Sequence, residues 1–233
     1  MKTYFNFFCL LCLLFCLSCE DIANNRRLIF TGNLIDENNQ PIQNARLVST
    51  LNADLSFASA QNKIGQGQTN ANGFFEFTSL VPLSSNAGLQ ILPEESDAVT
   101  DEFADVALAF NNGVFDNVNQ IELNDFEIPR KAILELNILK TSTEPVFLEW
   151  TIERKTAQCF ISISDLNQLE NIEFCDTFFS ISGQNSPENP EESRTIESLR
   201  NSTVFFIYSI NNAPNQVIEI PLNNPSNVFE FTY

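Results

Sequence analysis

The sequence of 233 residues contains no histidine. Histidine is the usual general base of hydrolases and the commonest protein ligand for zinc and copper, so its absence argues against both kinds of site. A G-x-S-x-G nucleophile elbow, a P-loop and a dinucleotide-binding fingerprint are missing as well. We therefore predict that the protein is not an enzyme and has no catalytic residues, no metal ligands and no cofactor.

Basic side chains are scarce, with 12 Lys and Arg against 30 Asp and Glu and a formal net charge of −18. The negative electrostatic field of such a chain repels phosphates, so we expect no nucleic-acid partner. A glycosidase needs only two carboxylates, and the pair Glu149 and Glu153 could supply them, as could Asp97 with Asp101 or Glu102. With this many acids such pairs are unavoidable, and we assign no chemistry to them. The turn-forming run Asp36 to Asn39 lacks EF-hand spacing, which favours a capped turn over a calcium site.

Long apolar runs are also missing, apart from residues 5–17 near the N-terminus, which are apolar except for Asn6. Lys2 is the only charged side chain before Glu20. A helix of this run would span roughly 20 Å, against about 30 Å for the hydrocarbon core of a bilayer. The segment is therefore predicted to be a secretory signal peptide, residues 1–18, and not a transmembrane anchor.

The residues Cys16-Leu17-Ser18-Cys19 end this apolar run. They resemble the lipobox of bacterial lipoproteins, although Cys16 stands where leucine is usual. The resemblance implies that Cys19 is acylated, with diacylglyceryl and palmitate chains, and becomes the first residue of the mature chain. Two or more acyl chains anchor a protein stably to membrane lipid. The alternatives are an ordinary signal peptide cleaved near Ser18 and an uncleaved segment.

The residues that follow, Glu20 and Asp21, are acidic and begin a polar tether, residues 19–26. Such acidic starts resemble the signal that sends Bacteroidota lipoproteins to the outer face of the outer membrane. The resemblance implies a lipid-anchored, surface-facing protein, with a periplasm-facing anchor as the alternative. Without residues 1–18 the chain retains 11 basic and 30 acidic side chains, a net charge of about −19.

Only two of the six cysteines, Cys159 and Cys175, lie outside the signal and anchor. An exported, oxidising setting favours a disulfide between them. A hairpin centred on Asn167 would place them opposite each other, at a distance that a disulfide can bridge. A redox-active pair is the alternative, but the close spacing and basic surroundings of such thiols are absent.

The first half of the body shows strand patterns at 28–35, 45–50, 55–60 and 121–128, and Asn72-Gly73 predicts a tight turn before Phe75 and Phe77. Several positions in this half form one spaced sequence motif: Gly32, Asp36, Pro41-Ile42 and Ala45, followed by Thr69, Gly73, Phe75 and Phe77. This pattern resembles the carboxypeptidase regulatory-like domain over residues 27–129. The resemblance implies a Greek-key, transthyretin-like β-sandwich without peptidase residues, which serves as a stalk, spacer or docking unit.

The second half, residues 130–233, shows further short strand patterns and resembles no family known to us. The patterns lie at 132–139, 145–152, 157–163, 174–182, 203–210, 216–220 and 227–233. Residues 166–169 favour one helical turn, and residues 183–194 are predicted to be an exposed loop. The predicted fold class is all-β, with two antiparallel β-sandwich modules.

These features support two functional hypotheses. One is a non-catalytic outer-membrane lipoprotein that acts as an accessory or scaffolding subunit, with an outer-membrane protein partner. The alternative is a surface ligand-binding or adhesive lipoprotein, for example for glycans, to which Trp150 and Tyr208 could offer an aromatic platform. Both side chains are also well suited to the core of a sandwich.

Overall fold

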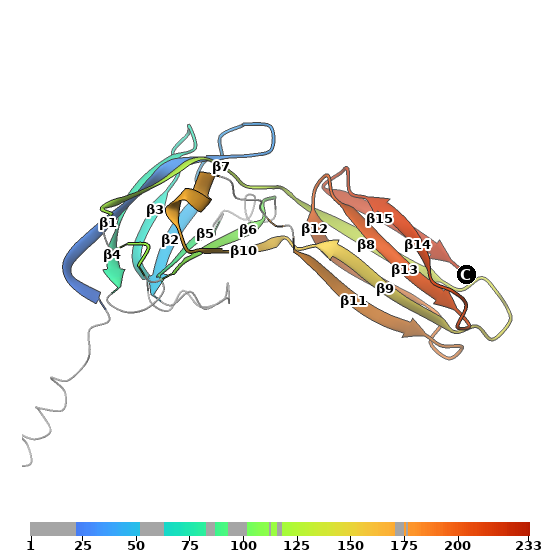
Figure 1. The fold of residues 1–233 in the computed structure, drawn as a ribbon. Coiled ribbons are helices and arrows are strands. Elements are labelled where there is room, and N and C mark those ends of the chain that lie inside the picture. The colour runs from blue at the N-terminus through green and yellow to red at the C-terminus, as the bar shows by residue number, and fades with distance from the viewer. Residues whose placement is uncertain are drawn as a thin grey trace, which may run out of the picture.

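The computed structural model describes residues 22–51, 63–82, 87–92, 102–111, 113–115, 118–170, 175 and 177–233. These residues form β-strands and one short 3-10 helix, η1 (Leu166–Glu170), at the predicted helical turn. The strands build two lobes that lie end to end, with the beginning of β1 (Ile22–Ile35) at one end and the C-terminus at the other (Figure 1). The predicted all-β class with two sandwich modules is confirmed. Within the described ranges, no helix is long and apolar enough to cross a membrane.

The first lobe is one eight-stranded sheet that curls around its own core. Its strands, in order across the sheet, are β10 (Gln158–Ile163), β6 (Asp105–Phe110), β5 (Ala87–Leu92), β2 (Arg46–Leu51), β3 (Lys63–Gln68), β4 (Phe74–Pro82), β1 and β7 (Gln120–Glu127). Strands β2, β3 and β4 follow one another and β5 returns to pair with β2, which is a Greek key. The pairs β1–β7 and β10–β6 are parallel, whereas the prediction was for antiparallel sheets.

Phenylalanine fills the core of this lobe. Phe75 and Phe77 lie on one face of β4, as predicted, and both are buried. The ring of Phe77 stacks on that of Phe30, with 5.3 Å between centroids. Gly73 has φ 74° in the preceding turn, and a Cβ there would lie 2.5 Å from the carbonyl oxygen of Leu34, so only glycine fits.

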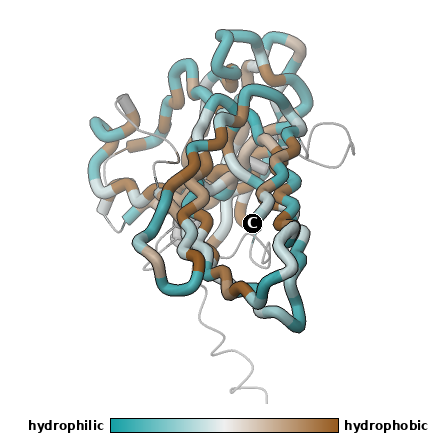
Figure 2. The backbone as a smooth tube through the Cα atoms, turned by 90° about the vertical axis from the view of Figure 1, so that its right-hand side faces the viewer, coloured by the Kyte–Doolittle hydropathy of each residue, from teal (hydrophilic) through white to brown (hydrophobic). Residues whose placement is uncertain are grey.

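The second lobe is an open sandwich of two sheets. One sheet has the order β11 (Phe178–Asn185), β9 (Leu148–Lys155), β13 (Thr203–Ile210) and β14 (Gln216–Pro221). The other has the order β12 (Glu192–Leu199), β8 (Lys131–Leu139) and β15 (Ser226–Thr232), with β8 and β15 parallel. Along β8 and β9 buried residues alternate with more exposed ones, and the buried apolar residues of the two sheets form a core between them. Figure 2 shows the hydrophobic stretches of the chain in brown.

Strand β10 departs from the expected division of the chain at residues 129 and 130. It was expected in the second module, but it pairs with β6 at the edge of the first sheet. Leu166 and Leu169 of η1, which follows β10, pack against the core of the first lobe. Residues 157–170 and Cys175 of the second half therefore help to close the first lobe.

Strand β12 begins within the segment 183–194 that is predicted to be an exposed loop. Residues 183–185 end β11, and only residues 186–191 connect it to β12. Polar residues dominate β12, yet Ile196 and Ser198 are buried against the rest of the lobe. The many polar residues of this segment belong to its exposed face, and they make the buried face of the strand hard to recognise in the sequence.

Candidate functional site

The outer face of the four-stranded sheet in the second lobe is the candidate site. Strand pairing aligns Gln184, Glu149 and Ser209 in one row across β11, β9 and β13. The next rows are Ser182, Thr151, Ile207 and Val217, and then Ser180, Glu153, Phe205 and Glu219. No strand of the described chain covers this face. It therefore presents a flat grid of polar and apolar side chains to solvent.

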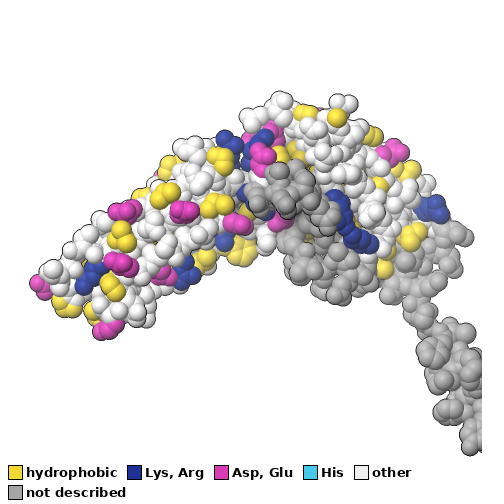
Figure 3. All heavy atoms as spheres, turned by 180° about the vertical axis from the view of Figure 1, so that it is seen from behind, with side chains coloured by type: hydrophobic (Ala, Val, Ile, Leu, Met, Phe, Trp, Pro, Cys, Tyr) yellow, Lys and Arg dark blue, Asp and Glu magenta, His cyan; other side chains and the backbone are white. Residues whose placement is uncertain are grey.

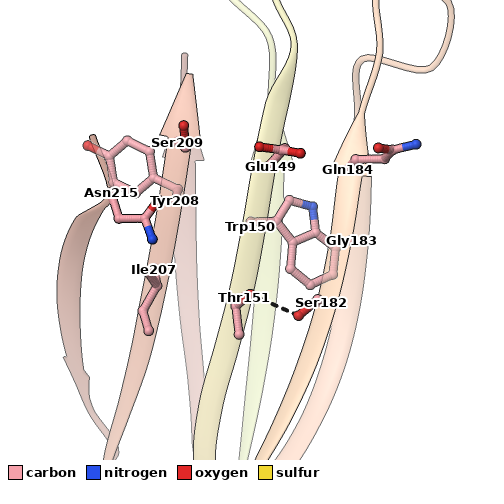
Figure 4. A pocket seen from close by; sticks show the side chains of 10 residues that line it. All are labelled: Glu149, Trp150, Thr151, Ser182, Gly183, Gln184, Ile207, Tyr208, Ser209 and Asn215. Atoms are coloured by element: carbon pink, nitrogen blue, oxygen red, sulfur yellow. Dashed lines mark hydrogen bonds between the residues drawn. The ribbon is translucent and has the colours of Figure 1, made fainter. Parts of the chain in front are cut away.

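A hollow of about 450 Å³ lies on this face, where β9 and β14 begin and β11 and β13 end. This end of the sheet points away from the first lobe (Figure 1). Figure 4 shows Glu149 and Gln184 side by side at its rim, with Thr151 and Ser182 below them. The two hydroxyl oxygens of Thr151 and Ser182 are 2.8 Å apart and share a hydrogen bond. The hollow has a volume typical of small-ligand sites.

A second hollow, of about 240 Å³, adjoins the first and shares Glu149 and Gln184 with it. The rest of its lining consists of Phe147, Leu148, Asn211 and Asn212. The backbone of Phe147 is fixed, because its N–H donates to Asn211 Oδ1 at 3.0 Å and its carbonyl accepts from the Asn211 N–H at 2.9 Å. Its ring nevertheless stays 57% exposed.

Trp150 and Tyr208 do not form an aromatic platform. Trp150 is 2% exposed and packs in the core, where its indole N–H donates to Asn185 Oδ1 at 2.8 Å. A Cβ on Gly183 would lie 2.2 Å from the indole ring, so a glycine is required opposite it. Tyr208 is half-buried against Phe231, with 4.6 Å between ring centroids. These side chains support the hollow from beneath.

Exposed phenylalanines lie at the other end of the same sheet. Phe178 and Phe179 begin the edge strand β11 and are 50% and 52% exposed. The ring of Phe178 contacts Phe205, with 6.4 Å between centroids, and Lys155 Nζ lies 6.0 Å from the Phe178 centroid. On the face seen in Figure 3, apolar side chains are scattered in small groups among polar ones.

The run Asp36 to Asn39 forms a capped turn, as predicted. Asp36 Oδ1 accepts from the N–H groups of Asn38 and Gln40, each at 2.8 Å, and Oδ2 accepts from Arg130 Nη2 at 2.6 Å. Burial alone would raise the pKa of Asp36, but these hydrogen bonds outweigh it and hold the pKa below its ordinary value. Both carboxylate oxygens of Asp36 are thus already engaged in hydrogen bonds within the protein.

Arg130 links this turn to the junction between the lobes. Its guanidinium also pairs with Glu37 and Glu102 and lies over the ring of Phe103, 5.0 Å from the centroid. Beside it, Lys131 Nζ contacts Asp105 Oδ2 at 3.4 Å. Burial raises the pKa of Asp105, and Lys131 only partly offsets this. These contacts are structural, and no group of three or more potential metal ligands occurs in the described part of the chain.

The predicted disulfide joins Cys159 and Cys175, whose Cα atoms are 4.8 Å apart. The hairpin proposed for it is wrong, because β10 pairs with β6 and β11 pairs with β9. Cys175 instead follows η1 with φ 59° and is buried in the core of the first lobe. The bond ties Cys175 back to β10 at the edge of the first sheet.

Several predicted features lie outside the described residues. They are the signal peptide, Cys19, the acidic pair after it, the strand at 55–60 and the acids Asp97 and Asp101. Glu149 and Glu153 both lie on the outer face of β9. Sequence analysis missed Phe147, Gln184 and Asn212 as site residues. The asparagine-rich stretch 211–215 beside a strand was the available signal.

No protein-family model and no curated protein matches the sequence. Among solved structures, the Bacillus anthracis TIE protein aligns at TM-score 0.32 and 11% identity, over 90% of this chain and 34% of that one. Shaft pilin spaA from Lactobacillus rhamnosus GG aligns at 0.29 and 10%, over 89% and 97%. A Bacteroides ovatus protein assigned provisionally to cell adhesion aligns at 0.28 and 11%, over 89% and 92%. This chain thus spans about a third of the TIE protein, and scores this low do not establish a common fold.

Proposed function

We propose that this chain is a non-catalytic lipoprotein of the outer membrane that serves as an accessory or scaffolding subunit of a membrane protein complex. Acylated Cys19 would hold the first lobe at the membrane surface, because it shortly precedes Ile22, where β1 begins. The second lobe lies at the opposite end of the molecule (Figure 1). It is therefore the part that reaches a partner, on the cell-surface side if the acidic residues after Cys19 act as an export signal.

The distribution of exposed apolar side chains carries the proposal. Five large ones in the described ranges are at least half exposed, and all five belong to the second lobe: Phe147, Phe178, Phe179, Val217 and Val228. Two of them are consecutive on β11, whose outer edge is unpaired in the described chain. An unpaired edge strand can accept a strand from another protein, and flanking pockets or side chains then give specificity.

The docking mode follows from the alternation of β11. Phe178 lies on the outer face of the sheet beside Phe205, and Phe179 lies on the opposite face. A partner strand added beside β11 would cover both rings and the free backbone groups together. Exposed phenylalanine rings at a protein interface contribute strongly, because they bury large apolar areas.

A pull-down from native membranes in mild detergent tests the proposal. The expected result is recovery of a membrane protein in fixed ratio with the wild-type chain, and loss of that protein from the double variant Phe178→Ser, Phe179→Ser. Phe74→Ser is the matched control, since Phe74 is 40% exposed but belongs to the first lobe. Recovery of the chain alone, or equal recovery of the partner by the double variant, would contradict the proposal.

A second candidate function is ligand binding or adhesion. The two adjoining hollows at the far end of the second lobe favour it, because they lie apart from the phenylalanines of β11. A lipid-anchored subunit can carry both a docking edge and a ligand site.

A further inference from the structure

The two adjoining hollows form one depression whose lining is rich in uncharged polar side chains. Amides come from Gln184, Asn212 and Asn215, and hydroxyls come from Thr151, Ser182 and Ser209. Each amide offers both donors and acceptors, and each hydroxyl offers one donor and two acceptors. Sugar hydroxyls have the same double character, so such a lining complements a carbohydrate in many orientations.

Four of the polar side chains have no partner within the described part of the chain. No hydrogen bond or ion pair to the side chain of Glu149, Gln184, Asn212 or Asn215 occurs among the described residues. The neighbouring Asn211 is different, because its Oδ1 is held by the N–H of Phe147. The unpartnered groups are therefore available to a ligand, whereas Asn211 positions the ring beside them.

Phe147 supplies the apolar part of the depression. Its backbone is fixed by two hydrogen bonds to Asn211, and its ring is 57% exposed. A fixed, exposed ring suits the C–H face of a pyranose, which carries partial positive charge toward the negative π-face of the ring. Because the backbone is already ordered, little entropy is lost there on binding.

The charge of the depression defines the class of ligand. No Lys or Arg lines either hollow, and Glu149 belongs to both. Glu153 follows on the same face of β9. Phosphates, sulfates and uronic acids would be repelled, and a single carboxylate is too few for a firmly held metal ion. A neutral ligand meets none of these penalties.

The floor of the depression is rigid. Beneath it the indole of Trp150 packs against Gly183 and donates to Asn185, and Tyr208 donates its hydroxyl hydrogen to Gln216 at 2.7 Å. Thr151 and Ser182 tie β9 to β11 across its base. Binding groups supported in this way are held in place before the ligand arrives.

From these features we infer that the depression binds a neutral oligosaccharide, with one sugar ring on Phe147 and its hydroxyls on Glu149, Gln184 and the asparagines. This inference deepens the ligand-binding candidate and does not rest on the partner at β11. The site uses the far ends of β9, β11 and β13, whereas the proposed docking edge begins at Phe178.

The test uses the full acylated chain in detergent micelles, titrated by isothermal calorimetry with short neutral glucans, mannans, galactans and xylans. Polygalacturonate and a sulfated galactan serve as anionic comparisons. We expect at least one neutral glycan to bind, with Phe147→Ala and Gln184→Ala each weakening it about tenfold or more. Val228→Ala, on the other sheet of the lobe, should leave the affinity unchanged.

Any of three results would overturn the inference. One is the absence of binding by every neutral glycan in the panel, and another is binding that Phe147→Ala and Gln184→Ala leave intact. Stronger binding of the anionic glycans would overturn it as well. Phe147→Ala should still recover the membrane partner in a pull-down, so a failure of this site and a failure of the docking edge can be told apart.

Discussion

The two lobes differ in how far the edge strands of their sheets are covered. The first lobe curls one sheet around its core, and the short helix η1 packs on that core and contacts both edge strands of the sheet, β10 and β7. The second lobe leaves β11, β14, β12 and β15 as edges of two open sheets. Unpaired edges are places where other chains can add. The proposed docking role of the second lobe depends on this difference.

Charge separates the lobes in the same sense. The segments 20–129 and 156–177, which contain the first-lobe strands, carry 20 acidic and 4 basic side chains. The segments 130–155 and 178–233 carry 10 acidic and 7 basic ones. A strongly acidic surface stays solvated and repels other acidic surfaces, whereas a nearly balanced one can approach a partner.

The largest expected effect comes from the core of the second lobe. Trp150→Ala should lower the free energy of unfolding by about 4 kcal/mol, because it empties a large buried site and removes the bond to Asn185. Urea unfolding followed by far-UV circular dichroism measures this loss. Tryptophan fluorescence is not suitable, because Trp150 is the sole tryptophan and the variant lacks it. Phe147→Ala, which removes an exposed ring, is the control. A loss below about 1 kcal/mol would mean that the lobe lacks a tightly packed core.

A smaller effect is expected from the disulfide of the first lobe. Replacing Cys159 and Cys175 with serine should lower the free energy of unfolding by about 3 kcal/mol, as a loop of this length implies. Reduction of the wild-type chain should produce the same shift in the urea midpoint, and reductant should not affect the double variant. If reductant shifted both proteins equally, the bond would not be the cause.

The smallest expected effect is a pH dependence from Asp36. Its pKa is lowered in the folded protein, so its stabilising contribution is complete above the ordinary value of 3.8. That contribution is lost as the pH falls through the lowered pKa. Asp36→Asn should therefore flatten the stability profile below pH 3.8, which urea unfolding at a series of acidic pH values can measure. An unchanged slope in the variant would show that Arg130 does not stabilise this carboxylate.

Local patterns predicted most strands, because alternation specifies a face without reference to the partner. The strand at 203–210 coincides with β13, and the turn at Gly73 has the positive φ that its glycine indicated. Pairing between strands was harder. The sequence of residues 158–163 does not show that they pair with β6. That pairing is between segments far apart in the chain and depends on how the whole lobe folds.

The site was hardest to predict. The glycan hypothesis was based on Trp150 and Tyr208 as an exposed aromatic platform. Trp150 is instead buried beneath that surface. Phe147 and Gln184 look ordinary in sequence, and only the pairing of β9 with β11 brings Gln184 beside Glu149. A flat binding face is assembled from single residues of several strands, so it leaves no compact motif.

The position of β10 also determines the order in which the protein can mature. A chain synthesised from its N-terminus presents residues up to 129 first, with β6 not yet paired to β10. That edge of β6 is covered only after β8 and β9 have been made and β10 has returned to it. Oxidation of Cys159 with Cys175 then ties Cys175 to β10. The first lobe is thus completed only after β8 and β9 of the second lobe have been made, so the two lobes form one unit of assembly.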